Sequence, residues 1–215
     1  MSKSEQQRLS QIGSTILSCA ITWRLASEDY ALRRLIYLHI MKNESYADQI
    51  GLIQEYYDDK WSKFGNVMRE NGNWKDAEKL ESQVMDMRKK QLGAEHPHTL
   101  TSMVNLSGTY RNLGRWNEAE QLEVQVMDMG KKLLGPEHPD TLKSMANLAV
   151  TYSNQGRWKE AEQLEVQVMD MAKKLLSAEH PDTLKSVANL AVTYRNQGRW
   201  NEAEQLEVQV MDMRQ

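Results

Sequence analysis

Amide and cationic side chains recur at a constant interval over most of this sequence. The asparagines at positions 105, 147 and 189 lie 42 residues apart, and so do those at positions 112, 154 and 196. Because an Asn amide both donates and accepts hydrogen bonds, such a row can pair with the main chain of an extended peptide. The candidate peptide-binding residues are Asn105, Asn147, Asn189, Asn112, Asn154 and Asn196, with the cations Arg69, Arg111, Arg195, Lys143 and Lys185.

The cations beside this row imply a charge preference. A partner segment with acidic character would be favoured by electrostatic complementarity. The competing interpretation is that the asparagines only support helix packing and that the cations are ordinary solvated surface. The sequence leaves both interpretations open.

The histidines and the cysteine do not form the pattern of a catalytic site or a metal site. His96, His138 and His180 lie in identical Glu-His-Pro turns. Stacked helices are about 8–10 Å apart, so equivalent histidines are too distant to share a metal ion, and we expect each imidazole to stabilise its own turn. Cys19 lies on an apolar stripe, where a thiol behaves as a small hydrophobic group. The sequence contains no phosphate-loop or His-Glu-x-x-His motif, so we predict no enzyme, no metal and no cofactor.

Composition narrows the classes of partner. The chain has 215 residues, a net charge of −3 and one cysteine. It lacks the basic excess of nucleic-acid-binding domains, it cannot form an internal disulfide, and it has no apolar run of the roughly 20 residues that a membrane span needs. We predict no nucleic-acid partner, no membrane partner and a cytoplasmic location.

A pair of helices in each 42-residue unit can position the candidate residues. In the third unit we expect Asp140 to be the N-cap of the first helix, Pro139 to precede that helix, and Gly156 to end it in the left-handed conformation. Apolar residues at helical spacing mark the buried faces: Leu142, Met145, Leu148, Ala149 and Tyr152 on the first helix, and Trp158, Ala161, Leu164, Val168, Met171 and Leu175 on the second. A lone pair cannot bury both faces, so neighbouring pairs must stack.

The candidate residues share the opposite face of the first helix. Lys143, Asn147 and Asn154 are spaced by four and seven residues, which places them on one side. The second helices carry the acidic run "EAEQLE", which predicts an acidic outer surface. Their "VMDM" methionines are expected to fill gaps between stacked units.

This repeating pattern resembles the tetratricopeptide repeat. The segments "MVNLS", "MANLA" and "VANLA" carry the resemblance, since each is followed by a Tyr, a turn Gly and an Ala. The 42-residue period looks like the variant of kinesin light chains and of fungal NB-ARC/NACHT receptor-like proteins. The resemblance implies an all-α, right-handed α-solenoid whose first helices line a concave groove, with asparagines at the places of Asn105, Asn147 and Asn189 holding a peptide main chain. The expected division is 1–56 (N-terminal helical cap or linker), 57–97, 98–139 and 140–181 (repeats 1 to 3), and 182–215 (truncated repeat 4).

Some positions depart from the family pattern. Acidic residues occupy a second-helix position that is commonly apolar in the family: Glu81, Glu123, Glu165 and Glu207. His98 replaces the expected capping Asp, and Ser177 replaces the glycine found at Gly135. We expect slightly looser joints at these positions.

We therefore predict a non-catalytic protein-interaction scaffold that binds an extended, acidic peptide in a concave groove. One alternative is the sensor repeat region of a fungal NLR-like receptor. Another is a self-assembly module that forms homo-oligomers through the last helix of repeat 4, where Leu206, Val210 and Met213 are expected to be unshielded.

Overall fold

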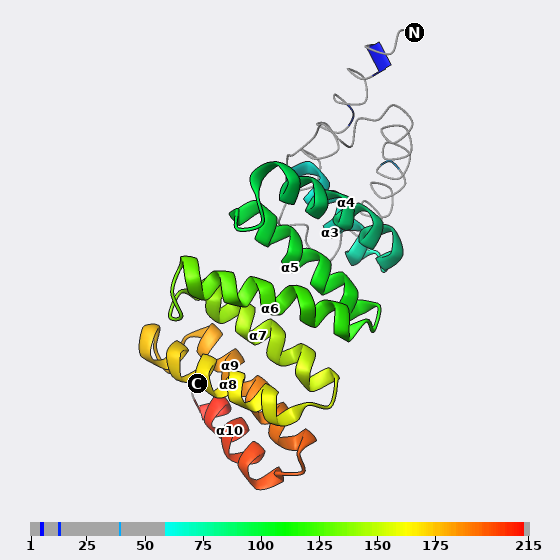
Figure 1. Ribbon diagram of the computed structural model, residues 1–215. Coiled ribbons are helices and arrows are strands. Elements are labelled where there is room, and N and C mark those ends of the chain that lie inside the picture. The colour runs from blue at the N-terminus through cyan, green and yellow to red at the C-terminus, as the bar shows by residue number, and fades with distance from the viewer. Residues whose placement is uncertain (1–4, 7–12, 14–38, 40–58, 213–215) are drawn as a thin grey trace. The chain divides into compact units, whose positions relative to one another are not determined.

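The computed structural model describes residues 5, 6, 13, 39 and 59–212. In residues 59–212 it contains eight helices and no strand, which confirms the all-helical fold class (Figure 1). The helices are α3 (Asp59–Glu70), α4 (Trp74–Leu92), α5 (Pro97–Asn112), α6 (Trp116–Leu133), α7 (Pro139–Asn154), α8 (Trp158–Leu175), α9 (Pro181–Asn196) and α10 (Trp200–Asp212). Apart from residues 5, 6, 13 and 39, the predicted N-terminal cap over 1–56, with Cys19, lies outside the described residues, and so does the C-terminal Met213.

The chain forms two compact units, Met1–Leu113 and Gly114–Gln215. In the N-terminal unit, α4 packs against both α3 and α5. Phe64, Met68 and Leu80 are fully buried there. Arg88 of α4 is also buried, and its Nη1 donates to the His98 carbonyl oxygen (3.2 Å) and to Ser102 Oγ (2.9 Å). A buried guanidinium thus joins α4 to the start of α5.

In the C-terminal unit, each helix from α6 to α10 packs against the next. One apolar cluster joins Leu142 and Met145 of α7 to Val168 of α8, with Met127 and Met171 packed against it. The equivalent cluster one repeat later contains the buried Leu184, Val187 and Val210, with Met169 and Leu206 against them. These contacts confirm for Met127, Met169 and Met171 that methionines of the "VMDM" segments pack between stacked helices, whereas Met211 of α10 is exposed.

The first helix of each pair begins at a proline that follows a capping histidine. In α7 the N-cap is His138, whose backbone is extended (φ −68°, ψ 139°) and whose Nδ1 accepts the Asp140 amide proton at 3.2 Å. Pro139 is the first helical residue, where its missing N–H is not needed. His96 and His180 cap α5 and α9 in the same way.

These caps correct one expectation and confirm another. Asp140 is not the N-cap and Pro139 does not precede the helix, because the imidazole of His138 already accepts the free amide of residue 140. For the same reason His98 does not replace a capping group, since His96 caps α5. The prediction that these histidines stabilise their own turns is confirmed.

Glycine ends the first helices as predicted. Gly156 has φ +76°, and Gly114 and Gly198 have similar positive values. The following amide, that of Arg157, donates to the Tyr152 carbonyl oxygen at 2.9 Å, which closes the helix end. The chain then reverses directly into α8, so the two helices of a pair lie antiparallel.

The surface of α10 differs from the expectation. Val210 is buried against α9 and Leu206 is half-buried there, so neither is unshielded. They face the helix that precedes α10 in its own pair. The apolar side chains that α10 exposes are Trp200 (65 %), Met211 (59 %) and Val208 (43 %).

The exposure of Trp158 also differs from the expectation. Trp158 was expected on the buried stripe of α8, but it is 39 % exposed because it occupies the first position of that helix, at the edge of the pair. Within the described part of the chain, no helix is long and apolar enough to cross a membrane.

Candidate functional site

The candidate residues of the C-terminal unit lie on one face of α7 and α9. These two first helices contact each other, and Asn196 Nδ2 lies 3.4 Å from Ser153 Oγ, so their C-terminal ends are side by side. Asn147 and Asn189 are half-buried on this face. We call it the amide surface, and it consists of Lys143, Asn147, Asn154, Lys185, Asn189 and Asn196.

The exposed members of the amide surface keep hydrogen-bonding capacity. Lys143 and Lys185 are exposed, and neither forms an ion pair with any described residue. Asn154 is exposed, and its Nδ2 donates to the Val150 carbonyl oxygen at 2.8 Å, which leaves its carbonyl oxygen as an acceptor. The surface thus combines two solvated cations with four amides.

The candidate residues of the N-terminal unit have a different environment. Asn105 is half-buried, its backbone carbonyl oxygen lies 3.4 Å from Arg69 Nη1, and Asn112 is exposed. Arg69 Nε lies 3.2 Å from Glu81 Oε1, and its Nη2 also donates to Asn66 Oδ1. The Arg69 guanidinium is therefore occupied by groups of its own chain.

The other two predicted arginines differ in exposure. Arg111 is half-buried at the end of α5. Arg195 is exposed on α9, and its Nε lies 3.5 Å from Glu207 Oε1. An exposed pair at this distance contributes little to stability, so Arg195 can exchange its partner for another anion.

The sequence reasoning missed a set of buried glutamates. Glu81, Glu123 and Glu165 are only 3 to 4 % exposed. Each lies beside a threonine of the next first helix: Thr109 Oγ1 donates to Glu81 Oε2 at 2.5 Å, and Thr151 Oγ1 donates to Glu123 Oε2 at 2.6 Å. These residues were expected to loosen the joints between helices, whereas the hydrogen bonds join α4 to α5 and α6 to α7.

Burial raises the pKa of two of these carboxyl groups, and the neighbouring groups that modify this effect differ. Burial raises the pKa of Glu81, and the opposing effects are the charge of Arg69 and the Thr109 hydrogen bond. Burial raises the pKa of Glu165 to about 7, opposed by the Thr193 hydroxyl and reinforced by the negative charge of Glu162. Glu165 has no cation within ion-pair distance among the described residues.

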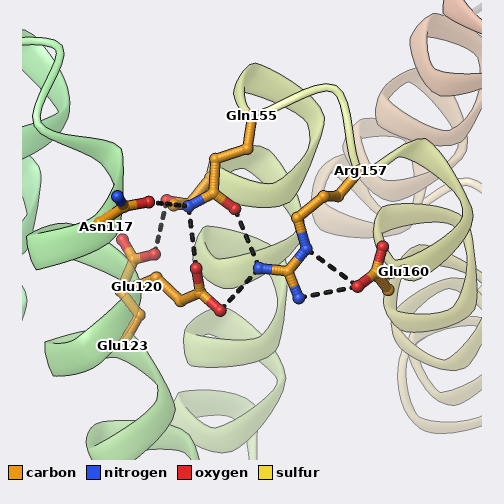
Figure 2. A network of polar contacts seen from close by, with 7 residues as sticks. Asn117, Glu120, Glu123, Gln155, Arg157 and Glu160 are labelled. Atoms are coloured by element: carbon orange, nitrogen blue, oxygen red, sulfur yellow. Dashed lines mark hydrogen bonds and ion pairs between the residues drawn. The ribbon is translucent and has the colours of Figure 1, made fainter.

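A second polar network joins the helix pairs at their turns (Figure 2). Arg157 lies between two carboxylates, with Nη1 2.7 Å from Glu120 Oε1 and Nη2 2.7 Å from Glu160 Oε1. Its guanidinium also lies 4.1 Å from the centre of the Tyr152 ring. Gln155 Nε2 donates to Glu120 Oε2 at 2.8 Å. The network therefore connects α6, the turn after α7, and α8.

The same network recurs one repeat later around Arg199. Its Nη1 lies 2.8 Å from Glu162 Oε1, and its guanidinium is 3.9 Å from the Tyr194 ring centre. Gln197 is the equivalent of Gln155 in this second network, and its Nε2 donates to Glu162 Oε2 at 2.8 Å. The recurrence of "QGRW" in the sequence was the signal that could have revealed this network.

Metal-binding chemistry receives no support from the described residues. No three His, Cys, Asp or Glu side chains among residues 59–212 and the four isolated positions are grouped so that they could hold an ion. The buried glutamates lie beside threonines and do not converge on one another.

Comparison with known proteins identifies the repeat. A family model described as tetratricopeptide repeat matches residues 62–98, 99–140, 141–182 and 183–215. No curated protein matches the chain. A single-residue variant of the nearly identical TPR-like repeats of a protein named as a "putative kinesin light chain" from Podosopora anserina is 30 % identical with a TM-score of 0.70. The alignment covers 86 % of this chain and 92 % of that one.

More distant structures share the fold alone. BtubC (BKLC) from P. vanneervenii is 16 % identical with a TM-score of 0.69, and the alignment covers 100 % of this chain and 91 % of that one. A signal transduction ATPase with numerous domains from Pyrococcus horikoshii, which has a tetratricopeptide repeat sensor, is 10 % identical with a TM-score of 0.69. That alignment covers 96 % of this chain and 31 % of that one. Because four matched segments span residues 62–215 and the helices pair within them, the chain belongs to the tetratricopeptide repeat family.

Proposed function

We propose that this chain is a non-catalytic interaction module that binds an extended segment of another protein on the amide surface of α7 and α9. Tetratricopeptide repeats generally mediate protein–protein interaction. The observation that carries the proposal is the row of Asn side chains at equivalent positions of two adjacent first helices, with partial solvent exposure. Amides at a fixed interval suit the repeating N–H and C=O groups of an extended main chain.

The bound segment carries acidic residues in this proposal. Lys143 and Lys185 are exposed cations at equivalent positions of the two helices, and they are not neutralised by any described carboxylate. Arg69 and Arg195 contribute less, because Glu81 and Glu207 already face them. Charge preference would therefore come mainly from the two lysines, and it would weaken with added salt.

A peptide array can test this function. The 215-residue chain is applied to an array of ten-residue peptides in which the number of Asp and Glu residues is varied, and binding is compared with that of the double variant Asn147→Ala/Asn189→Ala. We expect at least a 10-fold loss of affinity in the variant for every acidic peptide that binds. The matched control is Gln163→Ala, since Gln163 is an exposed amide on a second helix, α8. Unchanged affinity in the double variant would contradict the proposal.

Self-assembly is a second candidate function. The observation that favours it is the exposure of Trp200, Val208 and Met211 on one helix, α10. An uncovered apolar face of this kind invites association. A molecular mass that rises with concentration in light scattering is the expected result, and a constant monomer mass would exclude it.

The sensor region of a larger fungal NLR-like receptor remains the other candidate. It is supported by the likeness in fold to the tetratricopeptide repeat sensor of the Pyrococcus horikoshii protein. The test is to sequence the transcript upstream of the codon for Met1. A reading frame that encodes a phosphate-loop motif there would support this function, and an in-frame stop codon would contradict it.

A further inference from the structure

An open pocket lies beside the first turn of α6. It has a volume of about 510 Å³ and is lined by residues 114–118, by Gln155 at the end of α7 and by Arg157. All of these residues belong to the C-terminal unit. Gly114 and Asn117 are exposed and Trp116 is half-buried, so the pocket is accessible from solvent. Its volume is that of a site for a small molecule or for a few residues of a peptide.

The orientation of the amide groups in this pocket follows from Arg157 (Figure 2). Because a guanidinium only donates hydrogen bonds, the Gln155 side-chain oxygen faces Arg157 Nη1, at 3.2 Å. Gln155 Nε2 is therefore on the other side, where it donates to Asn117 Oδ1 at 3.2 Å and to Glu120 Oε2 at 2.8 Å. The Asn117 nitrogen, Nδ2, is in turn directed away from Gln155.

The amide and indole groups that remain open in the lining are hydrogen-bond donors. Asn117 Nδ2 has no acceptor among the described residues, and the same holds for Trp116 Nε1. The side-chain oxygens of Asn117 and Gln155 already accept hydrogen bonds from Gln155 and Arg157. A ligand that complements these groups therefore has to offer an acceptor, such as a carbonyl oxygen.

The charges around the pocket do not favour an anionic acceptor. Arg115 Nε donates to Glu118 Oε1 at 2.8 Å, and Arg157 lies between the carboxylates of Glu120 and Glu160. The hydrogen bonds from Arg115 and from its own backbone amide lower the pKa of Glu118, which keeps this carboxylate ionised at the pocket wall. Because like charges repel, the acceptor should belong to an uncharged group.

The indole ring of Trp116 selects among uncharged acceptors. A peptide unit that precedes a proline offers a carbonyl oxygen, and the proline brings no N–H that would lie unpaired beside the open donors. The proline ring is apolar and can pack on the indole. Proline-rich segments also dock on aromatic side chains in a preformed extended helix, so they lose little conformational entropy on binding.

We propose that this pocket binds a proline-containing segment of a partner protein, with the proline ring against Trp116 and the preceding carbonyl oxygen accepting from Asn117 Nδ2. The pocket shares no residue with the amide surface, and the proposal does not rest on the function proposed above. It gives the chain a second binding site, formed where the turn after α7 meets the start of α6.

The equivalent place one repeat later lacks the open amide. Lys159 of α8 has the position of Asn117. Gln197 Nε2 donates there to the Trp158 carbonyl oxygen at 3.2 Å, where Gln155 donates to the Asn117 side chain. Because a lysine ammonium is strongly hydrated, it is a poor substitute for an amide that binds a neutral carbonyl oxygen. The repeat therefore accommodates a lysine at this position, and the lysine should remove the proposed binding.

An NMR titration with two peptides can test the site without knowledge of the partner. One peptide contains three copies of Pro-Pro-Ser and the other three copies of Ala-Ala-Ser, both acetylated and amidated at their ends. The indole N–H resonance of Trp116, assigned with Trp116→Phe, and the Asn117 side-chain amide are followed in the full chain. We expect the proline peptide to bind about 10-fold more tightly. Equal affinity of the two peptides would overturn the proposal.

A lysine substitution and its matched control locate the binding. Asn117→Lys introduces the residue that α8 carries at the equivalent position, so it should fold and should weaken binding of the proline peptide about 10-fold. Asn201→Lys makes the same change at the equivalent exposed position of α10 and should bind like the wild type. Unchanged affinity in Asn117→Lys, or an equal loss in Asn201→Lys, would show that the pocket is not the binding site.

The double variant Asn147→Ala/Asn189→Ala separates this site from the proposed function. It should lose the acidic peptides of the array and keep its affinity for the proline peptide. Loss of the proline peptide in this variant would place that peptide on the amide surface and contradict the pocket. If the proline peptide binds in an Asn117-dependent way while no acidic peptide binds, the proposed function is wrong and the pocket stands.

Discussion

At the scale of single residues, the buried glutamates show that one position of the repeat can hold either a paired or an unpaired carboxylate. Glu81 has Arg69 at 3.2 Å, and its burial is partly compensated. Glu165 has the same place in its repeat and similar burial, but twelve positions before it stands Ser153, where the other three repeats carry an arginine. Identical folds therefore give a paired carboxylate in one repeat and an unpaired one in another.

The difference predicts a pH-dependent stability at Glu165. Its pKa in the folded chain is about 7, against an ordinary value of 4.5. Because the folded pKa is the higher one, the folded state binds more protons between these values, and stability falls as pH rises through 7. Glu165→Gln cannot ionise, so we expect it to be more stable than the wild type at pH 8 by about 1–3 kcal/mol, with little difference at pH 5. Urea denaturation at both pH values measures this.

Glu207→Gln is the matched control for that measurement. Glu207 occupies the same repeat position, but its side chain is 44 % exposed and Arg195 lies 3.5 Å away. It should show no gain at pH 8. A wild-type chain whose stability is constant from pH 5 to pH 8 would contradict the unpaired state of Glu165.

At the scale of elements, the helix pairs are joined by polar networks as well as by apolar contacts. Arg157 contacts Glu120 of α6 and Glu160 of α8 and stacks on Tyr152 of α7, so one side chain touches three helices. The two ion pairs hold the Arg157 guanidinium in one orientation, and their hydrogen bonds raise its pKa. The Arg157 side chain therefore links successive helix pairs through directional contacts.

This role predicts that Arg157→Ala destabilises the C-terminal unit. Arg157 and Glu120 are 37 % and 24 % exposed, so solvent weakens their attraction, and we expect a loss of about 1 kcal/mol from the pairs and the aromatic contact together. The control is Lys174→Ala, which removes the more exposed Lys174–Glu137 pair and should cost less than about 0.5 kcal/mol. Equal effects of the two variants in chemical denaturation would show that the Arg157 network does not couple the helices.

At the scale of the whole molecule, regular features could be predicted from the sequence and long-range pairs could not. The period, the helix pairs and the turn at Gly156 follow from local spacing and from glycine's tolerance of positive φ. The cap at His138 was missed because Asp140 is by propensity the better capping residue.

The Glu–Thr pairs were missed for a different physical reason. Glu123 and Thr151 lie 28 positions apart on separate helices, and glutamate is ordinarily a surface residue. Local periodicity carries no information about such a pair.

Because the repeats are nearly identical in sequence, the exposure of α10 can be compared with that of the equivalent helix α6. Residues 198–213 have the same sequence as residues 114–129, so Met211 corresponds to Met127. Met127 is packed against the cluster of α7 and α8, whereas Met211 is 59 % exposed. The face of α10 that bears Met211 therefore has the chemistry of a helix–helix interface without a described helix on it.

That comparison predicts self-association through α10. A second copy that covers Val208 and Met211 would remove their apolar area from water, and this burial stabilises the association by roughly 25 cal/mol per Å². We expect the mass measured by light scattering to rise with concentration from that of the 24.9 kDa chain. The double variant Val208→Lys/Met211→Glu should remain at the monomer mass, because charges on this face must be desolvated in the interface. Gln205→Lys, a charge placed on an exposed polar site of the same helix, should associate like the wild type. If both variants associate equally, the contact between copies does not involve this face of α10.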